Sequence, residues 1–106
     1  MATITHKRGD TFVLSCTLEN EGVPVDITGW TIASQVRDNS DQLLQALTVN
    51  VTSGAGGAFD LSATPAETET WGVQQYLCDI EFIDQTGEVN STDTFTLSVL
   101  RDITRA

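Results

Sequence analysis

Few side chains in this sequence could support nucleophilic or metal chemistry. His6 is the only histidine among the 106 residues, and the only cysteines are Cys16 and Cys78. A serine or cysteine nucleophile needs a positioned base, but His6 stands alone near a terminus that we expect to be flexible. A structural zinc site takes four ligands, more than these residues provide. We therefore expect no nucleophilic enzyme, no metal site and no cofactor.

Carboxylates are more abundant, and a pair of them could act as the acid and base of glycoside hydrolysis. The candidates for such a pair are Asp26, Asp60, Asp79 and Glu81. They are scattered singly and face outward on expected strands, which is typical of solvated carboxylates. Residues 38–41 lack the glycine and the distant bidentate glutamate of a calcium loop, and residues 54–57 precede no Lys-Ser/Thr or helix that could bind phosphate. The sequence thus predicts a protein that is not an enzyme.

The overall charge argues against two classes of partner. The chain has 15 acidic and 5 basic residues, which give a formal net charge of −10. Nucleic acid or an anionic membrane surface would require a basic face. No apolar run approaches the roughly 20 residues of a membrane span, and the N-terminus has no apolar signal-peptide core. We expect a single domain, residues 1–106, without a secretory signal.

The clearest structural signal lies in residues 76–82. Its apolar side chains occupy every second position, as in a half-buried strand: Tyr76, Cys78, Ile80 and Phe82. Residues 84–87 then predict a turn in which Gly87 takes a positive φ. Residues 88–100 would return as the antiparallel partner, which makes this hairpin the centre of the fold.

Alternating and β-branched runs predict the other strands, and one stretch rich in Thr and Glu is the only place for a helical turn. The expected strands are 12–18, 30–37, 43–51 and 58–62, with an extended start at 23–27 and a helical turn at 64–71. The structural core residues that we expect are Phe12, Cys16, Trp30, Trp71, Tyr76 and Cys78.

About seven antiparallel strands with turn signals every 8–12 residues predict an all-β fold, an immunoglobulin-like β-sandwich. Cys16, Trp30 and Cys78 follow the order Cys, Trp, Cys of immunoglobulin domains. Tyr76 stands two residues before the second cysteine, where a tyrosine corner lies in such domains. Both cysteines face inward, so they could form a disulfide or remain buried thiols, and the missing secretory signal favours thiols.

Contacts with other proteins would fall to loops and termini. Residues 52–57 are rich in glycine and predict either a mobile surface loop or backbone that becomes ordered when another subunit packs on it. The C-terminal residues 101–106 form a tail with a basic tip. The candidate protein-contact residues are Gly54, Gly56, Gly57, Arg101 and Arg105.

Several segments taken together resemble small immunoglobulin-like proteins of tailed bacteriophages. The segments are 7–12, 22–30 with 35–37, 76–80 with 84–89, and 94–97 with 102–105. The pattern is similar in particular to the N-terminal domain of the upper baseplate protein family, and to stand-alone virion proteins that share this domain. The resemblance spans nearly the whole chain and brings no catalytic residues with it.

The resemblance implies a structural part of the virion, assembled in the cytoplasm of the bacterial host. In the baseplate relatives such a domain docks the receptor-binding apparatus onto the tail within a symmetric assembly. We therefore expect a tail or baseplate adaptor that binds other virion proteins and forms a homo-oligomer. One alternative is a capsid decoration protein bound to the major capsid protein. A second is a free-standing carbohydrate-binding or adhesion module, which would need exposed aromatic side chains.

Overall fold

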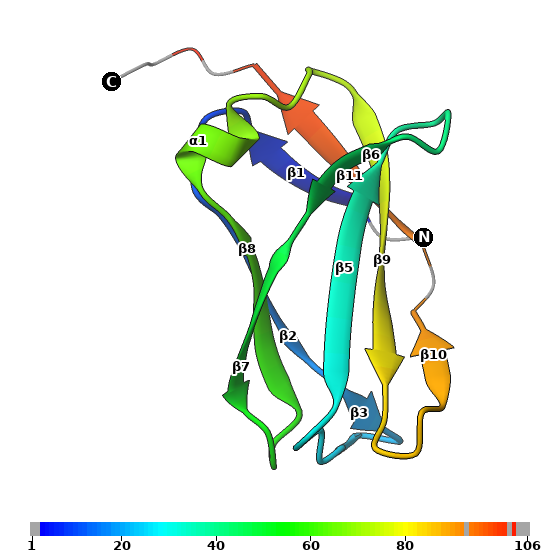
Figure 1. The fold of residues 1–106 in the computed structure, drawn as a ribbon. Coiled ribbons are helices and arrows are strands. Elements are labelled where there is room, and N and C mark those ends of the chain that lie inside the picture. The colour runs from blue at the N-terminus through cyan, green and yellow to red at the C-terminus, as the bar shows by residue number, and fades with distance from the viewer. Residues whose placement is uncertain (1–2, 93, 102, 104–106) are drawn as a thin grey trace.

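The computed structural model describes residues 3–92, 94–101 and 103. Two facing β-sheets and a small hairpin make up this part of the chain, with one short helix at one end (Figure 1). The larger sheet has the order β1 (Thr3–Lys7), β11 (Phe95–Leu100), β9 (Gln75–Ile83), β5 (Thr31–Arg37) and β6 (Leu43–Ala46), and β10 (Val89–Ser91) also pairs with β9. The second sheet has the order β2 (Phe12–Thr17), β8 (Ala58–Ala63) and β7 (Thr48–Ser53). The hairpin consists of β3 (Glu19–Asn20) and β4 (Val23–Pro24).

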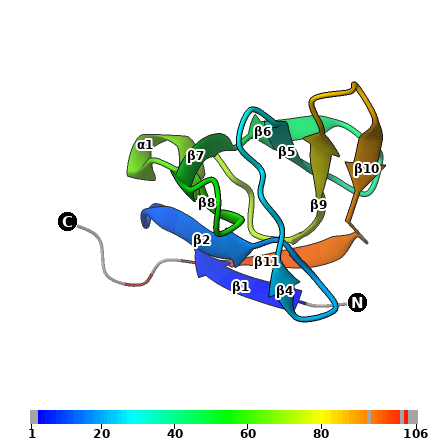
Figure 2. The same cartoon turned by 90° about the horizontal axis from the view of Figure 1, so that it is seen from below.

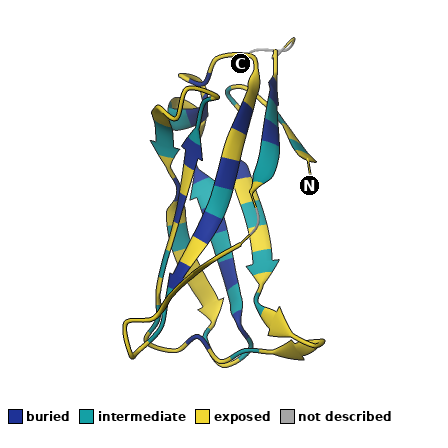
Figure 3. Cartoon of the chain, turned by 90° about the vertical axis from the view of Figure 1, so that its right-hand side faces the viewer, coloured by how far each residue is buried: buried dark blue, intermediate teal, exposed yellow. Residues whose placement is uncertain are grey.

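The core lies between the two sheets. Seen from below, β2, β7 and β8 lie on one side, and β5, β9 and β10 lie on the other (Figure 2). Buried and more exposed residues alternate along the main strands, because successive side chains point to opposite faces (Figure 3). The all-β, immunoglobulin-like sandwich expected from the sequence is confirmed.

The central hairpin forms as predicted. The four alternate residues from Tyr76 to Phe82 are all buried in β9. Gly87 has a φ of 88° in the turn that follows, a conformation that glycine adopts at little cost. The returning chain is divided into β10 and β11, and both pair antiparallel with β9.

The N-terminal segment is a strand, so the prediction of a flexible terminus at His6 is wrong. β1 pairs with β11 in parallel, with Thr3 opposite Thr96 and Lys7 opposite Leu100. The His6 ring packs edge-on against Phe12, with 5.1 Å between the ring centroids. The expectation of antiparallel strands throughout therefore fails at this edge. The pairing joins the first and the last of the described strands, and no local pattern in residues 3–7 indicates it.

The strand predicted over residues 43–51 is in fact two strands in different sheets. β6 pairs with β5, whereas β7 pairs with β8. Leu47 lies between them, is buried, and donates its backbone N–H to the Ser34 carbonyl at 2.9 Å. Because the chain crosses from one sheet to the other at Leu47, the apolar residues change parity there.

The predicted helical turn is α1 (Pro65–Thr68), which is closed by a capping box. The Thr64 hydroxyl accepts from the Glu67 N–H at 3.2 Å, and the Glu67 carboxylate accepts from the Thr64 N–H at 2.8 Å. The chain then enters the core at Trp71, which is fully buried. The Tyr76 hydroxyl donates to the Gly72 carbonyl at 2.8 Å, which forms the expected tyrosine corner.

Candidate protein-contact site

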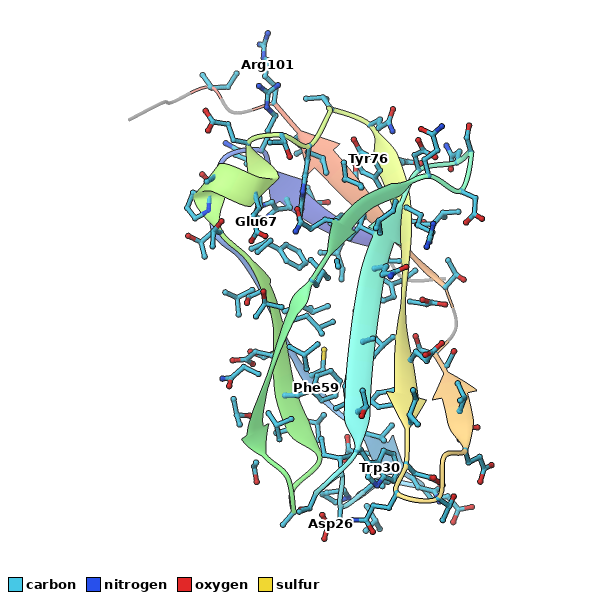
Figure 4. The ribbon with its side chains drawn as sticks, viewed as in Figure 1. Asp26, Trp30, Phe59, Glu67, Tyr76 and Arg101 are labelled. Atoms are coloured by element: carbon cyan, nitrogen blue, oxygen red, sulfur yellow. The ribbon has the colours of Figure 1, made fainter. Side chains whose placement is uncertain are left out.

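The structure places the predicted contact residues at opposite ends of the sandwich. Arg101 follows β11 at the end that carries α1, here called the helix end (Figure 4). The loop from Gly54 to Gly57 lies at the other end, beside Asp26, and this is called the loop end. Arg105 lies outside the described residues. Arg101 and the glycine loop therefore do not form a single site.

Backbone hydrogen bonds tie the glycine loop to the segment between β2 and β5. The Ile27 N–H donates to the Gly54 carbonyl at 2.9 Å, and the Leu18 N–H donates to the Gly57 carbonyl at 2.8 Å. Gly57 is buried with a φ of 69°, and a Cβ atom there would lie 2.6 Å from the Leu18 carbonyl oxygen. Gly57 is thus an internal packing residue, which corrects its assignment as a contact residue. Gly54 and Gly56 keep partial exposure.

Two aspartates at the loop end are fixed by turns. The Asp26 carboxylate accepts from the Thr28 N–H at 2.9 Å. The Asp84 carboxylate accepts from the Thr86 hydroxyl at 2.6 Å, from the Thr86 N–H at 2.9 Å and from the Glu88 N–H at 3.0 Å. The hydrogen bonds from Thr28 lower the pKa of Asp26, and those from Thr86, led by its hydroxyl, lower the pKa of Asp84. Both carboxylates are therefore charged at neutral pH.

The two ends differ in charge. The acids of the loop end are Glu19, Glu21, Asp26, Asp84 and Glu88. The lysine and arginines that the structure describes, Lys7, Arg8, Arg37 and Arg101, lie toward the helix end. Arg8 donates to the Glu69 carbonyl after α1 at 3.0 Å, and Arg37 lies opposite Leu77 near the start of β9. Within the described part of the chain, the loop end is thus an acidic surface without a neighbouring base.

A groove of about 560 Å³ opens beside Trp30, between the β3–β4 hairpin and β10. Trp30 is half-buried and packs edge-on against Phe82, with ring centroids 6.4 Å apart. Trp30 therefore takes its predicted place in the core only in part, because it also lines this groove. The other walls mix apolar Leu18 and Val25 with polar groups such as Asn90. No local sequence pattern indicates this groove, because its walls come from distant segments.

The aromatic side chains do not form an exposed platform. All seven Phe, Trp and Tyr residues lie within the described part of the chain, and each is buried or half-buried. Trp71 packs against Phe12 at the helix end, with ring centroids 5.7 Å apart, whereas Trp30 lies at the loop end (Figure 4). A carbohydrate-binding module that stacks sugars on neighbouring aromatics would require a different surface.

Both cysteines are free thiols. Cys78 is buried, and its Sγ lies 3.3 Å from the Ser34 Oγ, while Cys16 is half-buried. Burial raises the pKa of both thiols, and the Asp60 carboxylate raises that of Cys16 further. A raised pKa keeps a thiol protonated and unreactive, so these residues act here as small apolar core side chains.

Residues 3–92, 94–101 and 103 contain no group of three or more His, Cys, Asp and Glu side chains that could hold a metal ion. No helix within these residues has the length and apolar character that crossing a membrane requires.

A scan against models of known protein families found no match, and a search of curated protein sequences also found none. Solved structures do share the fold. CopC from Methylosinus trichosporium OB3b matches with a TM-score of 0.62 and 10% identity, over 100% of this chain and 91% of that one. The N-terminal domain of ORF48 from phage TP901-1 matches with a TM-score of 0.60 and 14% identity, over 93% of this chain and 83% of that one.

These likenesses define the class of protein, an immunoglobulin-like β-sandwich whose fold occurs in a phage protein domain. At 10% and 14% identity they establish the fold and no more. What the chain does has to be argued from its own surface and from the resemblance in its sequence.

Proposed function

We propose that this chain is a non-enzymatic structural protein of a tailed-phage virion, a docking module of the tail or baseplate. The observation that carries the proposal is the fold shared with the phage TP901-1 domain over 93% of this chain. The sequence segments that resemble the upper baseplate protein family support it independently of the fold comparison. The two thiols, whose pKa values burial raises, agree with a protein that has no catalytic role.

The loop end is the surface on which we expect docking. Its acids are exposed except for the half-buried Asp84, and turns hold Asp26 and Asp84 in place, so a partner meets a defined pattern of negative charge. A basic surface on another virion protein would be complementary to it, whereas nucleic acid and anionic lipid would be repelled. A weak contact is sufficient in a symmetric particle, because several copies bind together.

Analysis of purified particles tests this proposal. We expect quantitative mass spectrometry to find the chain at a fixed copy number in gradient-purified, salt-washed particles of the phage that encodes it. Separated tails should contain the protein and separated heads should not. Its absence from particles would overturn the proposal, and its recovery only with heads would identify it as a capsid decoration protein.

Charge-reversal variants test which end docks. Glu21→Lys changes the exposed tip of the β3–β4 hairpin at the loop end, and Glu69→Lys changes an acid that is also exposed, at the helix end. Both variants change the net charge by the same amount. In a phage that lacks the gene, we expect Glu69→Lys to restore particle assembly and Glu21→Lys to restore it at least about tenfold less well. Equal restoration by both variants would contradict docking through the loop end.

A further inference from the structure

One long stretch of this acidic chain carries no charge at all. No Asp, Glu, Lys or Arg occurs from residue 42 to residue 59, although charged residues make up 19% of the sequence. The stretch includes all of β6 and β7 and the loop that leads to β8. On a molecule with a net charge of −10, this stretch makes up a side without charges of its own, here called the neutral side, although Asp60 of β8 lies opposite Asn50 next to it.

The outer edge of β7 is open. β7 is the last strand of its sheet, and among the described strands it pairs only with β8. Thr48, Asn50, Val51 and Thr52 are exposed, and Val51 retains 45% of its accessible surface although it faces the same side as Val49. Natural proteins protect such edges with charges, prolines or bulges, because unpaired backbone groups attract another strand. Here the only such device is the irregularity after Val51, which leaves residues 48–51 regular.

We propose that β7 pairs with β7 of a second copy of this chain, antiparallel and across a two-fold axis. The two three-stranded sheets would then become one six-stranded sheet. A two-fold axis brings the same strand of each copy together in opposite directions, which is the geometry of an antiparallel pair. This contact deepens the proposed function, since it gives the expected copies of a virion protein a way to associate.

The distribution of charge favours a second copy of the chain as the partner that pairs with the edge of β7. Two molecules that each carry a net charge of −10 repel over most orientations, and the neutral side is where they approach at the least electrostatic cost. The other edge of the same sheet, β2, also lacks charge within the strand, but Asp10 and Glu19 stand close to its two ends. A basic partner would instead be drawn to the loop end.

Light scattering on the purified chain, together with native mass spectrometry, tests the contact. We expect a monomer–dimer equilibrium that shifts to dimer at high protein concentration and at high salt, because salt screens the repulsion. Amide hydrogen exchange of residues 48–51 should slow as the dimer forms. A monomer at every concentration would overturn this contact, while detection of the chain in purified particles would still support the virion role.

Two lysine variants distinguish the two edges of the sheet. Asn50 is exposed and lies opposite Asp60 in β8, so Asn50→Lys adds a favourable neighbour within the monomer. Across the two-fold axis it brings two lysines together, and we expect the dimer dissociation constant to rise at least about tenfold. Val13→Lys makes the same change at the exposed edge strand β2 and should leave dimerisation unchanged. A dimer that Val13→Lys disrupts and Asn50→Lys does not would overturn the assignment to β7.

Discussion

The helix end and the loop end of the sandwich are stabilised by different parts of the chain. At the helix end, the rings of Trp71, Phe12 and His6 pack together, and the buried Thr68 hydroxyl connects α1 to the turn before β2. At the loop end, carbonyl groups of the glycine loop accept backbone hydrogen bonds from the segment after β2. Packed rings and a buried hydroxyl thus close the helix end, whereas the loop end has, besides buried side chains such as Ile27, a glycine loop that is held by backbone hydrogen bonds.

This difference bears on where contacts can evolve. A side chain that fills the core cannot change without a cost in stability, whereas an exposed side chain on a backbone-anchored loop can. The exposed acids of the loop end therefore remain available for recognition. The predictions that follow test this contrast, beginning with the largest expected effect.

Trp71→Ala should have the largest effect on stability. Trp71 is fully buried, so its removal leaves a cavity at the helix end and should lower the free energy of unfolding by about 3–5 kcal/mol. Urea denaturation followed by circular dichroism measures the change. Val73→Ala removes an exposed side chain two residues away and should have little effect. A loss below about 1 kcal/mol for Trp71→Ala would show that the helix end does not depend on this ring.

Gly57→Ala tests the backbone geometry of the loop end. The added Cβ would lie 2.6 Å from the Leu18 carbonyl oxygen and 2.7 Å from that of Val25, on a residue with positive φ. We expect a loss of about 2–4 kcal/mol in urea denaturation, from the strained φ and the clash together.

Gly22→Ala is the matched control for the clash. Gly22 has a φ of 79°, but a Cβ there meets no atom within 4 Å. Gly22→Ala should therefore lower the free energy of unfolding only by the cost of a positive φ at alanine, about 1–2 kcal/mol. If the two alanine variants were equally stable, the close packing of the glycine loop would not contribute to the loop end.

The sequence predicted the elements whose signals are local. The alternation in β9, the positive φ of Gly87 and the helical turn after Thr64 each depend on a few neighbouring residues. The parallel pairing of β1 and the change of sheet at Leu47 depend on distant partners, so the local pattern was uninformative or misleading there.

The candidate site was less predictable than the fold. Composition identified the glycine loop, but whether a glycine lies on the surface or under another segment depends on what packs against it. Gly57 is covered by the segment between β2 and β5, which no pattern in residues 52–57 could reveal. The separation of Arg101 from this loop likewise follows from the direction of β11 in the sheet.

Thr68→Val should show a smaller loss at the helix end. The buried Thr68 hydroxyl donates to the Asp10 carbonyl at 2.8 Å and accepts from the Gly9 N–H at 3.1 Å. Valine keeps the shape but leaves the Gly9 N–H without its acceptor, while the Asp10 carbonyl keeps only its contact with the His6 ring at 3.0 Å, so we expect a loss of about 1–3 kcal/mol in urea denaturation. Thr70→Val removes an exposed hydroxyl nearby and should change stability by less than about 0.5 kcal/mol. Equal losses for both would contradict a specific role for the Thr68 bridge.

One carboxylate at each end makes stability depend on pH, and we expect this to be the smallest of the predicted effects on stability. At the helix end, the Thr64 N–H lowers the pKa of Glu67 from its ordinary 4.5, and at the loop end the bonds from Thr86 lower the pKa of Asp84 from 3.8. A pKa that is lower in the folded state means stability that is present above the unfolded-state pKa and is lost as the pH falls through the folded one. We expect these contributions to be complete at pH 7 and to decline below about pH 4.5.

Acidification also reduces the net negative charge, and the weaker repulsion between carboxylates favours the folded state. Glu67→Gln and Asp84→Asn separate this general effect from the stability that is lost when Glu67 or Asp84 becomes protonated. Each variant keeps an acceptor oxygen but cannot titrate, so its melting temperature should fall less than that of the parent chain between pH 5 and pH 3, as followed by circular dichroism. The Asp84 carboxylate accepts from the Thr86 hydroxyl and from two backbone N–H groups, whereas the Glu67 carboxylate accepts from the Thr64 N–H and the Gln45 amide. The difference from the parent chain should therefore be larger for Asp84→Asn. A larger difference for Glu67→Gln than for Asp84→Asn would contradict this expectation. It would mean that the capping box contributes more to stability than the Asp84 turn does.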